Sequence, residues 1–392
     1  MNFFKNKRKK GKRQSGFTLM ELLLGSAIML IVILGALALY VRSNKVSVDQ
    51  QQLAEVQHDV RSGMYFISRD IRMAGVGLSP DVTGYFLEGQ DSFGPNPEIS
   101  DAIRLWGNFD DPLGLKIQKY QGGGGGGAAT AFLYDSELIN APYDCPGFYI
   151  NKVYLIISTT CPGCYTYRFL SDVQGCGPGV AHVMFQPGQS EINPPGGLVD
   201  TGCSEECWDD AIITLGQIKY YWLDTTGHPG DYPGLANLDA AHGYLENVPN
   251  VLYVTTNGPT GQIMHMPLAM NIENLQFEYN GDFSNPPDGI LDGFRPWNNA
   301  WTILPGDDEA TRQTKGELIS RITEVKMWIL GKTPRPFLTV GRRVPANLDL
   351  FRRPAISNSP RAGQDDLHRR FLLESTSNIR NLSLTIYNTG AR

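Results

Sequence analysis

A single carboxylate, Glu21, stands at the start of an apolar run in which residues 22–41 carry no charge. An ionised carboxylate in hydrocarbon is costly, so a residue in this position predicts a function and a charged partner. Cleavage of the chain between Gly16 and Phe17 would create an α-amino group at Phe17, four residues before Glu21. We expect a neighbouring copy, shifted along the helix axis, to bring its own Phe17 amine to this carboxylate.

Six cysteines form a second group with chemical potential, and all of them lie between residues 145 and 207. They are Cys145, Cys161, Cys164, Cys176, Cys203 and Cys207. An even, clustered set in an exported protein predicts disulfides, for which six cysteines allow fifteen pairings. The spacings Cys161-x2-Cys164 and Cys203-x3-Cys207 also fit two halves of a zinc site. Disulfides are favoured because the chain is expected to leave the cytoplasm.

Three carboxylates, Asp282, Asp288 and Asp292, lie in a glycine-containing stretch over residues 281–293. Clustered carboxylates on a flexible loop are suitable ligands for Ca²⁺, which takes six to eight oxygens. Their spacing is not that of an EF-hand, and Asp-Gly pairs are equally common in ordinary turns. We therefore expect either a calcium site or a hydrogen-bonded turn here, and we expect no other cofactor.

The residues Gly-Phe-Thr-Leu-Met-Glu at 16–21, between a basic segment and an apolar helix, resemble the class III signal of type IV prepilins and type II secretion pseudopilins. The resemblance implies that prepilin peptidase cuts after Gly16 and methylates the new N-terminus at Phe17. It also implies that Glu21 sets the register of subunits through a salt bridge. An ordinary signal peptide, the alternative, places its small cleavage-site residues after the apolar core, whereas Gly16 lies before it.

Charge is divided unevenly along the chain. The first 16 residues hold seven lysines and arginines and no acid, and their removal leaves 27 basic against 40 acidic residues, a net charge of −13. Because a basic flank marks the cytoplasmic side of a spanning helix, the remainder is expected outside the cytoplasm. An acidic mature chain also argues against nucleic-acid binding, which requires a basic surface.

Three parts are predicted: a leader over 1–16, which the prepilin resemblance implies, then a long helix over 17–75 and a head over 76–392, which the spacing of apolar residues and the change in composition indicate. Residues 22–41 are long enough to cross a membrane as a helix. From Val46 to Ile71 apolar residues recur at helical spacing, which predicts an amphipathic continuation. Glycine and proline beyond residue 74 predict its end.

The head is predicted to be rich in antiparallel β-structure, because short segments alternate apolar and polar residues. These segments are 148–159, 211–223, 251–256, 274–279, 321–331 and 382–387. Together with the long helix they predict an α+β fold in which the helix packs on the sheet. Loops are expected over 222–247 and 284–316, and also at the six-glycine run Gly122–Gly127.

Segments 271–279, 369–372 and 377–381 look like those of PilW-type minor pilins. This resemblance implies a non-catalytic subunit that helps to initiate or cap a type IV pilus. Its implied partners are other major and minor pilins, prepilin peptidase, the inner-membrane pilus assembly machinery, and the membrane itself through the N-terminal helix. The implied location is the inner membrane as a single-pass protein with an extracytoplasmic head, and then the pilus at the cell surface.

Two other functions fit the same sequence. A J-type minor pseudopilin of type II secretion would carry the same signal. An adhesin or other binding module could use the pilus as a stalk. An enzyme is the least expected class, because the chain contains neither a Gly-x-Ser-x-Gly nor a His-Glu-x-x-His motif.

Overall fold

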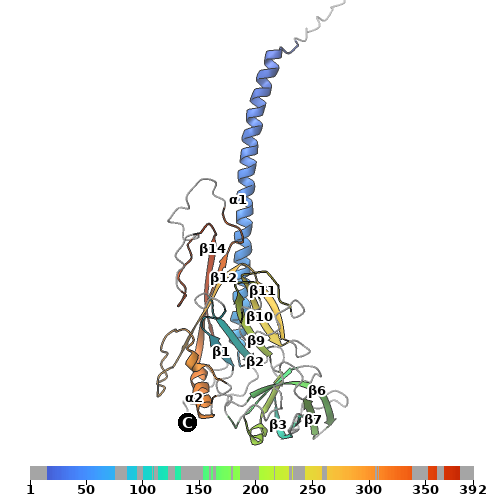
Figure 1. The fold of residues 1–392 in the computed structure, drawn as a ribbon, viewed down its shortest axis with the longest axis vertical. Coiled ribbons are helices and arrows are strands. Elements are labelled where there is room, and N and C mark those ends of the chain that lie inside the picture. The colour runs from blue at the N-terminus through green and yellow to red at the C-terminus, as the bar shows by residue number, and fades with distance from the viewer. Residues whose placement is uncertain are drawn as a thin grey trace, which may run out of the picture. The chain divides into compact units, whose positions relative to one another are not determined.

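The fold is described by a computed structural model (Figure 1). The described residues are 16–75, 86–94, 100–107, 109, 114–121, 129–133, 153–158, 160–161, 165–177, 180–185, 203–215, 217–228, 232, 243–257, 263–304, 307, 309–337, 352–359 and 366–379. Two compact units make up the chain, Met1–Gln52 and Leu53–Arg392. From here on, the head means this second unit, which includes residues 53–75 of the long helix in addition to residues 76–392.

The predicted N-terminal helix is confirmed as α1, which spans Leu19–Met73 and contributes residues to both units. The helix ends where glycine was predicted to end it. Gly75 adopts a φ of 77°, a backbone conformation that glycine reaches without strain. The side chains of residues 16–47 are exposed, whereas α1 buries one face within the head. The point at which the uncharged apolar run gives way to apolar residues at helical spacing therefore matches the point at which the side chains of α1 change from exposed to buried on one face.

A five-stranded antiparallel sheet in the head has the order β1-β2-β9-β10-β11. Its strands are β1 (Leu87–Gln90), β2 (Ala102–Gly107), β9 (Gln217–Asp224), β10 (Val251–Asn257) and β11 (Ile263–Ala269). A three-stranded antiparallel sheet has the order β12-β13-β14. Its strands are β12 (Ile272–Gly281), β13 (Ile322–Lys332) and β14 (Arg370–Asn378). The predicted α+β class is confirmed.

A closed barrel of order β3-β4-β7-β6-β5-β8 completes the described head. Its strands are β3 (Gly114–Gln121), β4 (Ala129–Leu133), β5 (Val153–Ile157), β6 (Tyr165–Gly177), β7 (Val180–Phe185) and β8 (Ile212–Leu215). All six strands come from the stretch between β2 and β9, which are neighbours in the five-stranded sheet. The barrel is therefore an insertion between two paired strands, and all six cysteines belong to the inserted stretch.

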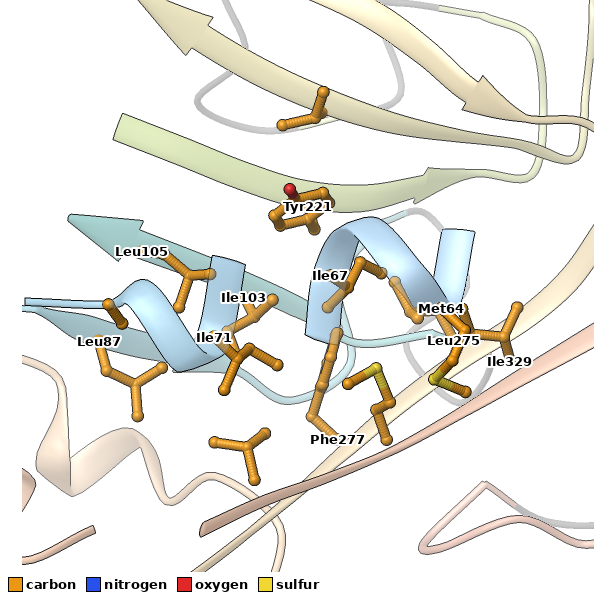
Figure 2. Close-up of a cluster of buried hydrophobic side chains, with 14 of the residues drawn as sticks. Met64, Ile67, Ile71, Leu87, Ile103, Leu105, Tyr221, Leu275, Phe277 and Ile329 are labelled. Atoms are coloured by element: carbon orange, nitrogen blue, oxygen red, sulfur yellow. The ribbon is translucent and has the colours of Figure 1, made fainter. Parts of the chain in front are cut away.

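The principal core of the head lies where α1 meets both sheets. Figure 2 shows Met64, Ile67 and Ile71 of the helix among Leu87, Ile103, Leu105 and Tyr221 of one sheet and Leu275, Phe277 and Ile329 of the other. Glycines allow this close approach. A Cβ at Gly331 would lie 2.5 Å from Val56 Cγ1, and one at Gly63 would lie 2.7 Å from Leu252 Cδ2.

Most of the predicted strands are confirmed, and the loop predicted over 284–316 is wrong in part. Residues Glu309–Ser320 form helix α2, and Asn299–Trp301 form a short 3₁₀ helix. The proline, glycine and aspartate residues that suggested a loop lie before α2, whereas α2 itself is rich in residues that favour helix. The glycine run 122–127 and the segment 382–387 lie outside the described residues.

Candidate functional site

The first turn of α1 holds Glu21 in a reciprocal hydrogen-bonded cap. Glu21 Oε2 accepts hydrogen bonds from the backbone N–H of Thr18 and from its Oγ1, each at 3.0 Å. Thr18 Oγ1 in turn accepts from the backbone N–H of Glu21 at 3.3 Å. This is a capping box of the Thr-x-x-Glu type. Thr18 is not among the site residues predicted from the sequence, although its three-residue spacing to Glu21 is the signal of a capping box.

The cap places a negative charge at the helix N-terminus, where unpaired N–H groups of the first turn favour it. Phe17 lies two residues before the first residue of the helix and is exposed. The bonds to Thr18 use only Oε2 of Glu21 within the described chain, so Oε1 can accept from a donor on another molecule. The arrangement thus combines an intramolecular cap with a carboxylate that can receive an external cation.

The segment that follows has the properties of a membrane anchor. By length and composition, the N-terminal part of α1 meets the requirement for crossing a membrane, and no other helix in the described part of the chain does so. Its leucine, isoleucine, valine and methionine side chains are exposed. Glu21 is the only charged residue between Thr18 and Val41, so it is distinguished from its surroundings by charge alone.

A buried charge network attaches the second half of α1 to the five-stranded sheet. The Asp70 carboxylate is buried and accepts from Lys219 Nζ at 2.8 Å and from Arg69 Nε at 2.9 Å. It also accepts from the hydroxyl of Tyr221 on β9. Burial raises the pKa of Tyr221, so this hydroxyl remains a donor at ordinary pH. The network fixes the helix in the head by directional bonds as well as by apolar packing.

The cysteine prediction is confirmed for one bridge. Cys161 and Cys207 form a disulfide with a Cα–Cα distance of 5.4 Å, and Cys203 is also disulfide-bonded. The bridge joins one member of each pair that the zinc interpretation used, so those two thiols are not zinc ligands and that alternative is wrong for them. Cys145 and Cys164 lie outside the described residues, and of Cys176 only the backbone, in β6, is described.

Removal of this bridge should weaken the barrel. The disulfide joins Cys161, four residues beyond the end of β5, to Cys207 in the 3₁₀ helix at Glu205–Trp208, across a sequence separation of 46 residues. Replacing both Cys161 and Cys207 with Ser is expected to cost about 2–4 kcal/mol of stability, because the unfolded chain gains conformational freedom. Urea denaturation without reductant measures this cost. Non-reducing peptide mapping that fails to join the peptides of Cys161 and Cys207 would contradict the pairing.

The three carboxylates between residues 282 and 292 all accept backbone hydrogen bonds. Asp282 Oδ2 accepts from Gly289 N at 2.7 Å, Asp288 Oδ1 from Ile290 N at 2.9 Å, and Asp292 Oδ2 from Phe283 N at 2.7 Å. The sequence predicted either a calcium site or a hydrogen-bonded turn here, and these bonds form the turn. Among the described residues, no group of three or more His, Cys, Asp or Glu side chains is arranged to hold a metal ion. Calcium binding stays a prediction, which a calcium-dependent rise in melting temperature would test.

Comparison with known proteins identifies the N-terminal segment. Residues 11–37 match the family described as the prokaryotic N-terminal methylation motif. A comparison with curated protein sequences gives no match. Among solved structures, the chain is similar to a type IV-like pilin from Thermus thermophilus, with 10% sequence identity and a TM-score of 0.27, covering 83% of this chain and 96% of that chain. The identification therefore rests on the motif, which contains the capping box and most of the apolar run.

Proposed function

We propose that this chain, which carries the prokaryotic N-terminal methylation motif over residues 11–37, is a minor, PilW-like pilin that helps to initiate or cap a type IV pilus. The observation that carries the proposal is the coincidence of three features over residues 5–41: the basic flank, the capped Glu21 and the exposed apolar helix, with the methylation motif at their centre. The role is structural, and its chemistry consists of cleavage and methylation performed by another protein.

The mechanism follows from charge and solvation. The chain inserts with its basic leader in the cytoplasm and its head outside. Prepilin peptidase removes residues 1–16 and methylates the Phe17 amine. The inner-membrane assembly machinery then extracts the subunit into a bundle of α1 helices. An ionised Glu21 has no water to solvate it in that bundle, so a pair with a neighbour's Phe17 amine offsets part of the cost and favours one register.

The head supports this placement. The Cys161–Cys207 disulfide is typical of proteins that leave the reducing cytoplasm. A single-pass protein of the inner membrane would thus expose its head outside the cytoplasm and later present it on the pilus. The partners are then other major and minor pilins, which contact this chain through α1.

One observation favours a second function, a binding module carried by the pilus. The six-stranded barrel is inserted between two paired strands, and the sheets do not require it to close their own core. Inserted, disulfide-linked elements on a rigid scaffold are common sites of recognition. Loss of surface attachment without loss of pili, in cells that produce a chain lacking the barrel, would favour this function. Loss of pili would favour the role in assembly.

Cleavage between Gly16 and Phe17 tests the proposed function directly. Mass spectrometry of the mature protein is expected to find an N-terminal peptide that begins with methylated Phe17. Gly16→Val is expected to prevent cleavage without disturbing the fold, because no atom lies within 4 Å of the position that its Cβ would occupy. A mature protein that retains residues 1–16, or that begins beyond Val41, would contradict the proposal.

A further inference from the structure

Arg353 is a buried cation in the head, and only 9% of its surface is exposed. Its Nε and Nη2 atoms are shielded from solvent, and neither has a hydrogen-bond partner. None of the ion pairs between described residues includes Arg353. A guanidinium cannot lose its charge in a protein, so burial without an acceptor carries the full cost of lost hydration. A charge held in this way indicates an anionic partner.

Arg370 shows how the same head holds a buried guanidinium that is paired. This residue is 5% exposed. Its Nε and Nη2 donate to the two oxygens of Glu273 at 2.6 and 3.0 Å, and its Nη1 and Nη2 donate to the two oxygens of Asp366 at 2.8 Å. Two carboxylates thus receive it in forked pairs, a strong arrangement for an arginine. Arg353 has similar burial and the same donors, so a carboxylate is the partner that fits it.

Arg353 lies in a segment that packs on the three-stranded sheet, and we call residues 352–359 the outer segment. Its Ile356 forms a buried cluster with Trp328 and Leu330 of β13. The residues of β13 that alternate with these two belong to the principal core beside α1, so Trp328 and Leu330 point to the opposite face of the sheet. Arg353 is three residues before Ile356 and therefore belongs to the side of the sheet turned away from α1.

The carboxylates on that side of the sheet are bonded to other donors. Ser357 Oγ donates to Oε1 of Glu278 on β12 at 2.8 Å. Lys326 Nζ pairs with Oε1 of Glu374 on β14 at 2.8 Å. Neither glutamate forms an ion pair with Arg353. The partner of Arg353 is therefore to be sought outside the part of the chain that the structure describes.

The outer segment is locally basic on an acidic chain. It contains Arg352 and Arg353 and no acid, whereas the mature chain has a net charge of −13. A local positive charge attracts anions, and a guanidinium presents its N–H groups as a planar fork that fits the two oxygens of a carboxylate. The exposed 9% keeps part of the Arg353 side chain open to solvent, so that a carboxylate can approach.

We propose that Arg353 binds a carboxylate that comes from outside this chain. Its source is either a small carboxylate in solution or an acidic side chain of a neighbouring pilin, and only the second source rests on the proposed function. Asp349 and Asp365 of this chain lie outside the described residues, and the experiment must distinguish them from an external carboxylate.

Sodium acetate is the probe for the carboxylate. Thermal unfolding of the full-length protein in detergent, followed by tryptophan fluorescence, is compared in acetate and in chloride at equal ionic strength. Acetate is expected to raise the melting temperature by about 3 °C, with saturation, because a ligand that binds only the folded head stabilises it. An equal melting temperature in the two salts at every concentration would overturn the proposal.

Arg353→Met separates an external carboxylate from one of this chain's own. Methionine keeps an apolar stem and carries no charge. If the carboxylate is external, the variant should melt higher in chloride than the unchanged protein, and its acetate response should be lost. Arg335→Met is the matched control and should keep the response, because Arg335 is an exposed arginine after β13. If Asp349 or Asp365 already pairs with Arg353, Arg353→Met should melt lower, and that result would contradict an external ligand.

Carbodiimide cross-linking in membranes identifies the source. Arg353→Lys places a primary amine at the site, and a carbodiimide joins such an amine to a carboxylate in contact with it. An amide to an acidic residue of another protein would assign the carboxylate to a neighbouring chain, whereas an acetate response without such an amide would assign it to a small molecule. An amide to Asp349 or Asp365 would refute the proposal. Arg335→Lys measures the background from an exposed amine.

These results are independent of the proposed function. The acetate response requires neither cleavage at Gly16 nor a filament, so it can be found in a protein that is never processed. Conversely, a protein that is cleaved and enters filaments but shows no acetate response would retain the proposed function and lose this site.

Discussion

Relative to the unchanged protein, the Asp101→Asn variant is expected to gain about 5 kcal/mol of stability as the pH rises from about 4 to about 8. Asp101 is only 3% exposed and lies where the two sheets meet. Its carboxyl group accepts from Ser92 N at 3.1 Å and from Phe277 N of β12 at 2.9 Å. Burial raises the pKa of Asp101 to about 8, and the neighbouring carboxyl of Asp91 raises it further.

The sign follows from the proton that folding takes up. Unfolded chains lose the proton of this aspartate near pH 3.8, whereas the folded head keeps it to about pH 8. The group's contribution is therefore fully present below pH 3.8 and is lost at about 1.4 kcal/mol per pH unit until about pH 8. Asparagine has no proton to lose and lacks this slope. At pH 4 the variant should be the less stable protein, because its amide nitrogen cannot accept a backbone N–H.

Urea denaturation of the full-length protein at a series of pH values measures the difference. All six tryptophans lie beyond residue 52, so their fluorescence reports on the head alone. Asp91→Asn is the matched control, because it removes the neighbouring negative charge while keeping the size of the side chain. The Asp91→Asn variant should lose stability with rising pH over a narrower pH range than the unchanged protein does. Parallel stability curves for Asp101→Asn and the unchanged protein would show that Asp101 is ionised in the fold.

Nothing in the local sequence marks Asp101 as a buried acid. Its burial depends on Phe277, which is 176 residues away and belongs to the other sheet. The same holds for the barrel, where β3 pairs with β8 and β5 pairs with β8 across long stretches of chain. Alternation of apolar and polar residues predicts that a segment is a strand, but it carries no information on which distant strand pairs with it.

Local patterns, in contrast, identified α1 and its one unusual charge. A period of 3.6 residues and the loss of charge between Leu22 and Val41 are properties of neighbouring residues. The disulfides show the boundary between the two kinds of inference. The even number and clustering of the cysteines, with the expected export, predicted that bridges form, whereas the choice of Cys161 with Cys207 among fifteen pairings required the fold. Helix α2 was missed because the loop-forming residues before it determined the interpretation of the whole stretch.

Glu21→Ala is expected to leave membrane insertion intact and to lower incorporation into filaments at least about tenfold, because it leaves a neighbour's Phe17 amine unpaired in a site without water. Removal of a charge makes insertion of the helix easier, so a loss of assembly cannot be attributed to a lost anchor. Quantitative immunoblotting of sheared filaments against membranes gives the ratio. The alanine variant also removes the cap with Thr18, so two further variants are needed to separate the two roles of Glu21.

Glu21→Gln and Thr18→Ala divide these roles. Glutamine preserves the capping box but carries no charge, whereas Thr18→Ala breaks the cap and keeps the carboxylate. If the charge sets the register, Glu21→Gln should lose incorporation almost as fully as Glu21→Ala, and Thr18→Ala should lose little. If the cap is the essential feature, the order is reversed. Normal amounts of Glu21→Gln in sheared filaments would show that assembly does not depend on a salt bridge to Phe17, and the carboxylate would then serve only the start of its own helix.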